Sequence, residues 1–425
     1  MHSARRIPSS LQAMVITALL PGIALVVGAC GDSQKQSPPA SETSAPATSA
    51  SSRVVTASSS VAAPVASSSA SPHTVASVVA PPESSPNVAP VVNESVDPVL
   101  AWRPNGKAFL VGIGKKLALI PVDGSKPRTF DDFPGNINTL VFSIKGDRFA
   151  SNDATNDVRV WDSNSGKVIA DLPDVPPGEI NDVVFSDDGK LISAASSFAV
   201  IWDIDKKKKR CATAETMMHQ IAFTRDQLSL VTTGVGNHAR WDATTCEQKA
   251  SGSAATGGTF GSWMSPDGKY AAAAAEDGHG LYLYETKVFQ EIERLAKSDG
   301  CTDHVGPLHF SRDGEILLAS GSFKWFRSFR MDSKKTIASY TVPQADELNF
   351  MIMFEDGERL LLGRKDKGEL VSAVDKKVVL TIDLKGATSF DVSWDRRYLL
   401  GANSKEAFVW DTSTGKLVRS FSMPQ

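Results

Sequence analysis

The feature that most restricts the fold of this chain is a short sequence motif that recurs about every 41 residues after residue 95. One copy has an apolar run at 180–186, an Asp-Asp-Gly turn at 187–189, a second apolar run at 190–195, and a third run that ends in Trp202-Asp203. Asp-Gly between two apolar runs predicts a β-hairpin. Each copy therefore predicts three strands, with room for a fourth before the next copy begins.

Eight copies align on their first turn, and the steps between successive turns run from 38 to 46 residues. The aligned turn positions are 106, 146, 189, 227, 268, 314, 357 and 396. This period, with Phe-Ser, Asp-Gly and Trp-Asp in fixed order, resembles the WD40 repeat family, whose blades are four-stranded antiparallel sheets around a channel. The resemblance covers residues 95–425. It implies an all-β fold, a WD40-like β-propeller of eight blades.

Seven blades are the alternative, in which the first copy, residues 97–133, lies outside the ring or completes another blade. Half of the Trp-Asp pairs are altered: Ile120-Pro121, Tyr284-Glu285 and Phe329-Arg330 replace them in copies one, five and six, and copy seven has no clear equivalent. In either arrangement, a closed ring covers apolar faces and strand edges that an open array of small sheets would expose.

Residues 1–29 have the pattern of a signal peptide, because two arginines and no acid precede an apolar run at 11–27. That run is interrupted by Pro-Gly and is shorter than the roughly 20 apolar residues that a membrane-spanning helix needs. The motif Val27-Gly28-Ala29-Cys30 resembles the lipobox of bacterial lipoproteins. The resemblance implies cleavage before Cys30 and lipid on its thiol. The alternative is an ordinary secretory signal with a cysteine near the cut.

Residues 30–94 are rich in Ser, Ala, Pro, Val and Thr and hold few aromatic or charged side chains. Such a composition predicts a disordered linker. With lipid on Cys30, this linker would tether the propeller to a membrane. Lipoproteins kept at the inner membrane of two-membrane bacteria typically have Asp after the cysteine, whereas this chain has Gly31. We therefore expect a lipid-anchored protein of the bacterial cell envelope, at the outer membrane, with the leaflet left open.

The sequence contains none of the common catalytic motifs: no Gly-x-Ser-x-Gly elbow, no His-Glu-x-x-His, no phosphate-binding glycine-rich loop and no Cys-x-x-Cys pair. We therefore expect a non-catalytic scaffold that binds a protein partner and needs no cofactor. The alternative is a propeller enzyme, or a binder of a small ligand or metal, that uses the central channel or one face. The 45 basic and 48 acidic residues nearly balance, which argues against a nucleic-acid partner.

Four histidines in copies four to six form a candidate metal site. They are expected in loops on one face of neighbouring blades: His219, His238, His279 and His304. Imidazole is a common ligand of transition metals. We favour the alternative, in which these histidines support blade structure or are solvated, and we predict no metal.

Two segments are candidate interaction sites. One is a basic run in the turn after Trp202-Asp203, on the opposite face from the histidines: Lys206, Lys207, Lys208, Lys209 and Arg210. Such a run can engage phosphate head groups or an acidic partner, and a solvated turn is the alternative that we favour. The other segment holds Phe323 and Trp325 among cations, a composition typical of interface hot spots.

Three cysteines follow Cys30. Cys211 and Cys246 each come after a Trp-Asp pair in adjacent copies, so a disulfide between them is sterically reasonable in a compartment that permits one. Cys301 is expected to face the other way. The sequence leaves open whether the bond forms.

Overall fold

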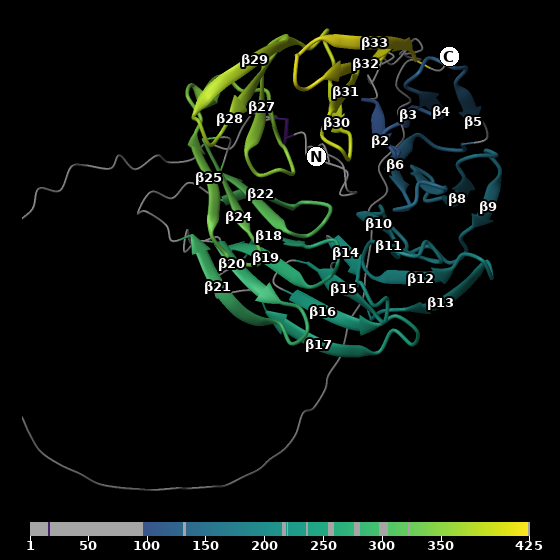
Figure 1. The fold of residues 1–425 in the computed structure, drawn as a ribbon. Helices are drawn as coiled ribbons and strands as arrows, with labels where there is room; N and C mark the ends of the chain where they lie inside the picture. Colours follow the sequence, from purple (N-terminus) through teal and green to yellow (C-terminus); the bar gives the residue numbers. More distant parts are fainter. Residues whose placement is uncertain are drawn as a thin grey trace, which may run out of the picture. The chain divides into compact units, whose positions relative to one another are not determined.

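The computed structural model describes residues 16–17 and 97–423, except 131–132, 215–217, 219, 235–236, 254–258, 276–280, 297–304 and 322–323. Residues 99–422 form eight antiparallel sheets, each built from strands consecutive in the chain. The sheets stand like blades around a central channel, with the first strand of each blade innermost (Figure 1). The predicted eight-bladed, all-β propeller is confirmed, and the seven-bladed alternative is wrong.

Blades 1 to 4 each have four strands, which follow one another from the channel outward. They are β2 (Val99–Trp102), β3 (Ala108–Ile113), β4 (Lys116–Pro121) and β5 (Arg128–Phe130); β6 (Ile137–Phe142), β7 (Arg148–Asp153), β8 (Val158–Asp162) and β9 (Val168–Asp171); β10 (Asp182–Phe185), β11 (Leu191–Ala195), β12 (Ala199–Asp203) and β13 (Lys208–Ala212); and β14 (Gln220–Phe223), β15 (Ser229–Thr233), β16 (Asn237–Asp242) and β17 (Gln248–Ser253).

Blades 5 to 8 continue this order around the ring. They are β18 (Thr259–Met264), β19 (Tyr270–Ala275), β20 (Leu281–Glu285) and β21 (Gln290–Ala296); β22 (Val305–Phe310), β23 (Ile316–Gly321), β24 (Trp325–Arg330) and β25 (Thr336–Thr341); β26 (Phe350–Met353), β27 (Arg359–Arg364), β28 (Lys367–Ser372) and β29 (Lys377–Asp383); and β30 (Ser389–Val392), β31 (Tyr398–Ala402), β32 (Glu406–Asp411) and β33 (Leu417–Ser422).

Blade 7 has two additional features. A fifth strand, β1 (Ile16–Thr17), pairs antiparallel with the inner edge of β26, with Ile16 opposite Met351 and Thr17 opposite Phe350. The 3-10 helix η1 (Ala345–Glu347) lies in the connection between β25 and β26. Across the described part of the chain, no helix combines the length and the apolar character needed to cross a membrane.

The repeated sequence motif forms a hydrogen-bonded turn between the first and second strands. In blade 3, the Ser186 hydroxyl donates to Asp188 at 2.8 Å, and Asp188 accepts the backbone N–H of Lys190 at 3.0 Å. The residue that ends the turn has a positive φ in every blade, which favours glycine because it has no Cβ. Six blades have glycine there, and blades 4 and 8 have Gln227 and Arg396.

The Trp-Asp pair holds the third strand and the turn after it. The indole of Trp161 is buried and donates to the Ser151 hydroxyl at 2.9 Å, which fixes β8 against β7. The following carboxylate, Asp162, accepts two backbone N–H groups of the next turn, and the one from Ser165 gives the largest lowering of its pKa. Trp and Asp therefore have separate structural tasks, so a blade can lose one and still fold.

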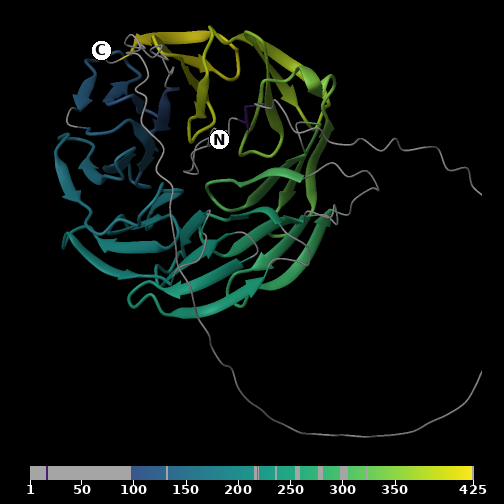
Figure 2. The same ribbon diagram turned by 180° about the vertical axis from the view of Figure 1, so that it is seen from behind.

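The ring closes without exchange of a strand between its ends. Blade 1 comes entirely from the start of the propeller and blade 8 entirely from its end, and the two lie side by side in blue and yellow in Figures 1 and 2. One apolar cluster joins them, in which Trp102 and Phe109 of blade 1 pack with Val409 of blade 8 and with Met423. Similar clusters join other neighbouring blades, so the core is a ring of contacts between sheets.

Candidate functional site

Antiparallel order gives the propeller two distinct faces. The turns between first and second strands, and between third and fourth strands, lie on one face, which we call the turn face. The connections between second and third strands, and between blades, lie on the other, which we call the loop face. The first strand, β2, runs from the loop face to the turn face, so the chain enters the propeller at the loop face.

A cluster of charged side chains ties three blades together where first turns meet around the channel. Arg312, in the first turn of blade 6, has a side chain only 8% exposed. Its Nε lies 3.4 Å from Oε1 of Glu355 in blade 7, and its Nη2 lies 3.5 Å from Oδ1 of Asp391 in blade 8. Nη1 and Nη2 also donate to the carbonyl of Val392 at 3.4 and 3.3 Å. The guanidinium lies 5.2 Å from the ring centre of Trp394.

The charges in this cluster offset one another. Burial raises the pKa of Glu355, but Arg312 and His309 outweigh this effect and hold that pKa below its ordinary value. His309 Nε2 lies 3.6 Å from Glu355 Oε1. Two carboxylates and a carbonyl thus surround one guanidinium, whose donors serve contacts between blades. This geometry suits an internal tie better than the capture of a substrate anion.

Carboxylates and amides also link the innermost strands directly. Asp391 Oδ2 accepts the backbone N–H of Trp102, and Asp182 Oδ2 accepts that of Ile221 at 3.0 Å. Among the described residues, no cation lies beside Asp182 as Arg312 lies beside Asp391, and burial raises the pKa of Asp182 to about 7. Gln220 Oε1 accepts the N–H of Met264 at 3.2 Å at the next seam. In each of these three pairs, a side chain of the preceding blade satisfies an inner-strand amide that would otherwise face the channel.

The turn face also carries the exposed aliphatic side chains of the described residues. Nine large apolar side chains are exposed, and each lies in a turn of this face or within the first three residues of a fourth strand. They are Ile144, Val168, Leu228, Val288, Val374, Val378, Val379, Leu417 and Val418. Scattered single apolar residues are normal, but among the described residues these nine gather on the turn face.

The structure describes one of the four candidate metal ligands. His238 was expected in a loop, and that prediction is wrong: it lies in β16, buried beside the rings of Tyr284 and Phe289. Burial lowers its pKa to about 4, and neither ring nitrogen has a hydrogen-bond partner. His219, His279 and His304 lie outside the described residues. Within the ranges that are described, no group of three metal-ligating side chains comes together.

The basic segment lies on the turn face, in the turn after β12 and the start of β13. Lys206 Nζ lies 2.8 Å and Arg210 Nη2 3.7 Å from Oδ2 of Asp203, and Lys209 Nζ lies 3.6 Å from Asp174. Lys207 and Lys208 are exposed. Acidic neighbours therefore offset much of the charge that the sequence presents as a continuous run.

Trp325 begins β24 on the loop face and is partly buried against the core between blades 5 and 6. The guanidinium of Arg327 lies 5.5 Å from its ring centre. Part of this segment is thus strand core, as a strand position requires. Phe323 and Cys30 lie outside the described residues.

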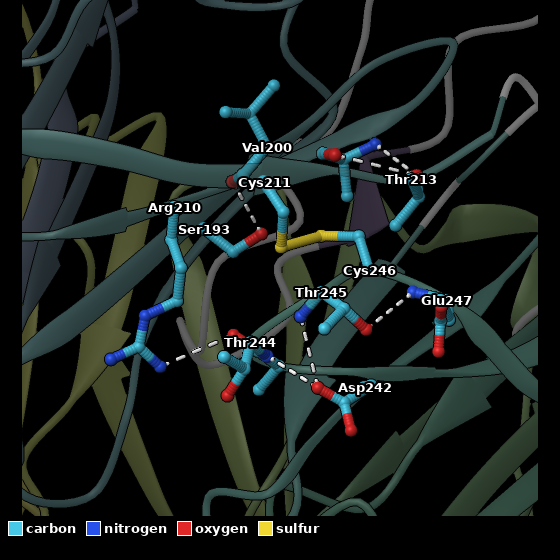
Figure 3. Close-up of a disulfide and its surroundings, with 12 residues drawn as sticks. Ser193, Val200, Arg210, Cys211, Thr213, Asp242, Thr244, Thr245, Cys246 and Glu247 are labelled. Atoms are coloured by element: carbon cyan, nitrogen blue, oxygen red, sulfur yellow. Dashed lines mark hydrogen bonds between the residues drawn. A yellow bond between two sulfur atoms is a disulfide. The ribbon is translucent and has the colours of Figure 1, made fainter.

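Cys211 of β13 and Cys246 of the turn after β16 form a disulfide. Figure 3 shows the bond between blades 3 and 4, with Arg210 beside it, where Nη1 donates to the Ala243 carbonyl at 3.3 Å. The two Cα atoms are 5.6 Å apart. The bond adds a covalent link to the packing between two blades.

Sequence reasoning missed Arg312, Glu355 and Trp394. All three occupy one position of the repeat, the second residue after the first strand. The other copies have Pro104, Ile144, Asp187, Arg225 and Pro266 there. When the copies are aligned, this position varies while the rest of the turn is regular. That variation, with large or charged residues in several copies, is the sequence signal that could have located these side chains.

No protein-family model matches this chain. It is similar to WD repeat-containing protein 1 of the rat, Rattus norvegicus, with 21% identity over 280 residues that cover 59% of this chain. The aligned part makes up 43% of the rat protein, so the chain spans less than half the length of that relative. The chain is thus an eight-bladed β-propeller with distant similarity to a WD repeat protein.

Proposed function

We propose that this protein is a lipid-anchored scaffold of the bacterial cell envelope, whose propeller binds a protein partner through its turn face and catalyses no reaction. The observation that carries the proposal is the gathering of exposed aliphatic side chains on that face. Burial of such side chains is the main favourable term in most protein association. The first propeller strand, β2, begins at the loop face, opposite the turn face.

Two further observations support the proposal. A disulfide links Cys211 and Cys246, and disulfides persist in oxidising compartments such as the periplasm or the cell surface. The charged cluster at the channel mouth is engaged in contacts between blades, since Arg312 interacts with Glu355, Asp391 and the Val392 carbonyl. That engagement favours a structural role for the cluster over catalysis.

Site-specific photo-crosslinking in living cells tests the choice of face. A photoreactive amino acid replaces Leu228, which is 68% exposed on the turn face, and, in a matched control, Ser404, which is exposed on the loop face. We expect a discrete crosslinked protein from position 228 and none from position 404. Equal or absent capture at both positions would refute a partner on the turn face.

The anchor has a separate test. Replacement of Cys30 by Ala is expected to abolish labelling by a fatty-acid probe and to release the protein from the membrane fraction. Labelling of the Cys30→Ala variant would show that lipid is attached at another residue. This result leaves the crosslinking outcome unaffected, because the propeller residues are unchanged.

A further inference from the structure

The innermost strand of blade 7 lies apart from its neighbours. Innermost strands lie against one another from blade 8 through blade 1 and on to blade 6, but β26 makes no comparable contact with β22 or β30 in the described chain. No neighbouring blade therefore covers its inner edge. An open edge presents unpaired N–H and C=O groups and is a template for another strand.

The register of blade 7 shows which groups face that edge. Phe354 donates its backbone N–H to the Arg359 carbonyl of β27 at 3.0 Å, and antiparallel ladders alternate residue by residue. Ile352 and Phe350 therefore also direct their backbone groups toward β27. The amide and carbonyl of Met351 and Met353 are directed to the open edge.

An extended segment of the chain occupies this edge. β1 runs antiparallel to β26, and Ile16 is the residue opposite Met351. Ile16 thus stands opposite the residue whose backbone groups are available, which is the arrangement of a hydrogen-bonded pair. Residues 11–27 belong to the predicted signal peptide, so cleavage before Cys30 would leave the edge open in the mature chain.

Contacts between blades 6 and 8 cross the turn-face end of β26. Arg312 of blade 6 reaches the Val392 carbonyl of blade 8 past the end of β26, and Arg396 of blade 8 lies 3.7 Å from Asp313 of blade 6. These contacts hold blades 6 and 8 together at the end of blade 7. A bound segment therefore reaches the edge from the loop face.

We propose that the inner edge of β26 is a binding site for an extended, aliphatic peptide segment of a partner protein, which adds to blade 7 as an antiparallel strand. Main-chain hydrogen bonds would supply affinity, as in other cases of strand addition. This site is separate from the turn face and is reached from the loop face, so it adds a second ligand class to the binding role proposed above and does not rest on the turn-face partner. The side chains of Phe350, Met351, Ile352 and Met353 pack into the cores on either side of blade 7, so the edge is presented by the main chain.

The test measures binding of a fluorescent peptide with the sequence of residues 12–21, extended by two lysines for solubility, to the mature chain with Cys30 replaced by Ala. Two matched peptides carry one backbone N-methyl group each. Methylation at Ile16 blocks the N–H that faces Met351, whereas methylation at Thr17 blocks one that faces away. We expect affinity to fall about tenfold or more for the first and less than about threefold for the second.

Amide hydrogen exchange gives the same test on the protein side. Bound peptide is expected to slow exchange in residues 350–353 and to leave residues 389–392 of blade 8 unchanged. Absence of binding, equal weakening by both methyl groups, or no protection of β26 would each overturn the proposal. The assay uses purified components, so its failure is separate from failure of the cellular crosslinking at Leu228.

Discussion

The backbone N–H of Trp102 donates to Oδ2 of Asp391 at 2.9 Å, and the Trp102 indole donates to the Asp391 carbonyl at 3.3 Å. These residues are 289 positions apart, in the first and last blades. Because no strand is exchanged at this seam, side-chain contacts and apolar packing must close the ring. Asp391 also holds Arg312, so one carboxylate connects the closing seam to the tie across blades 6 to 8.

Replacement of Asp391 by Asn is expected to lower the free energy of unfolding by about 3 kcal/mol, because it removes a charge from a buried ion pair and leaves Arg312 partly uncompensated. Urea unfolding of the mature chain measures the loss. Asp375→Asn is the matched control, since its carboxylate is exposed and lies 3.8 Å from Lys377; a change below about 0.5 kcal/mol is expected. Equal effects of the two variants would show that the Asp391 tie is not important for closure.

The blades were predictable because each is built from consecutive residues, so its strands and turns leave a local pattern. Blade 7 shows the limit of that pattern: Val371-Ser372 stands where four of the copies have Trp-Asp, yet β28 pairs with both neighbouring strands. The backbone ladder and core packing are sufficient there. Repeat spacing therefore predicted the blade although its signature pair is absent.

The charged cluster was not predictable from any local pattern. Arg312 meets Glu355 and Val392, which lie 43 and 80 residues farther along the chain. Contacts between blades join positions that are far apart in sequence and carry no spacing rule. His238 was misplaced for a related reason: β16 begins at Asn237, and its burial comes from Tyr284 and Phe289 of the next blade.

The turn residue Gln227 tests the cost of a positive φ. Gln227 has φ 60°, where six other blades have glycine, and a side chain in this region costs about 1 kcal/mol or more. Gln227→Gly is expected to stabilise the protein by about 0.5 kcal/mol, because part of the gain is offset by the greater freedom of glycine in the unfolded chain.

The reverse change at the equivalent turn of blade 3 is the control. Gly189 has φ 73°, and a Cβ there would meet only the Cβ of Ser143 at 3.8 Å, an ordinary contact. Gly189→Ala is therefore expected to cost about 1 kcal/mol from backbone strain alone. Thermal unfolding compares the two variants with the natural chain. A neutral Gly189→Ala variant would contradict the strain argument.

The pH dependence of stability depends on Asp182. Burial raises its folded pKa to about 7 from 3.8, so between about pH 4 and 7 the folded state holds a proton that the unfolded state has lost. Its contribution is fully present below pH 4 and is lost as pH rises to 7. The free energy of unfolding of Asp182→Asn, relative to that of the natural chain, should therefore rise by about 4 kcal/mol from pH 4 to pH 8. Urea unfolding at both pH values measures this difference.

His238 gives a slope of opposite sign. Burial lowers its folded pKa to about 4 from 6.5, so its contribution is present above pH 6.5 and is lost as pH falls toward 4. The difference in free energy of unfolding between His238→Phe and the natural chain should therefore shift by about 2 kcal/mol in favour of the variant when the pH is lowered from 8 to 5. The two slopes nearly cancel between pH 4 and 6.5 in the natural chain. A flat profile in either single variant would contradict the assigned burial.

The disulfide of Cys211 and Cys246 is expected to stabilise the propeller by about 4 kcal/mol, because it closes a loop with a sequence separation of 35 residues and restricts the unfolded chain. Urea unfolding with and without reductant measures this contribution. A Cys211→Ala/Cys246→Ala variant is the control, and its stability should not respond to reductant. Three cysteines follow Cys30, so the denatured, unreduced mature chain with Cys30 replaced by Ala should show one free thiol. Three free thiols in protein isolated from the cell envelope would show that the bond does not form there, and the compartment argument for an oxidising location would lose its support.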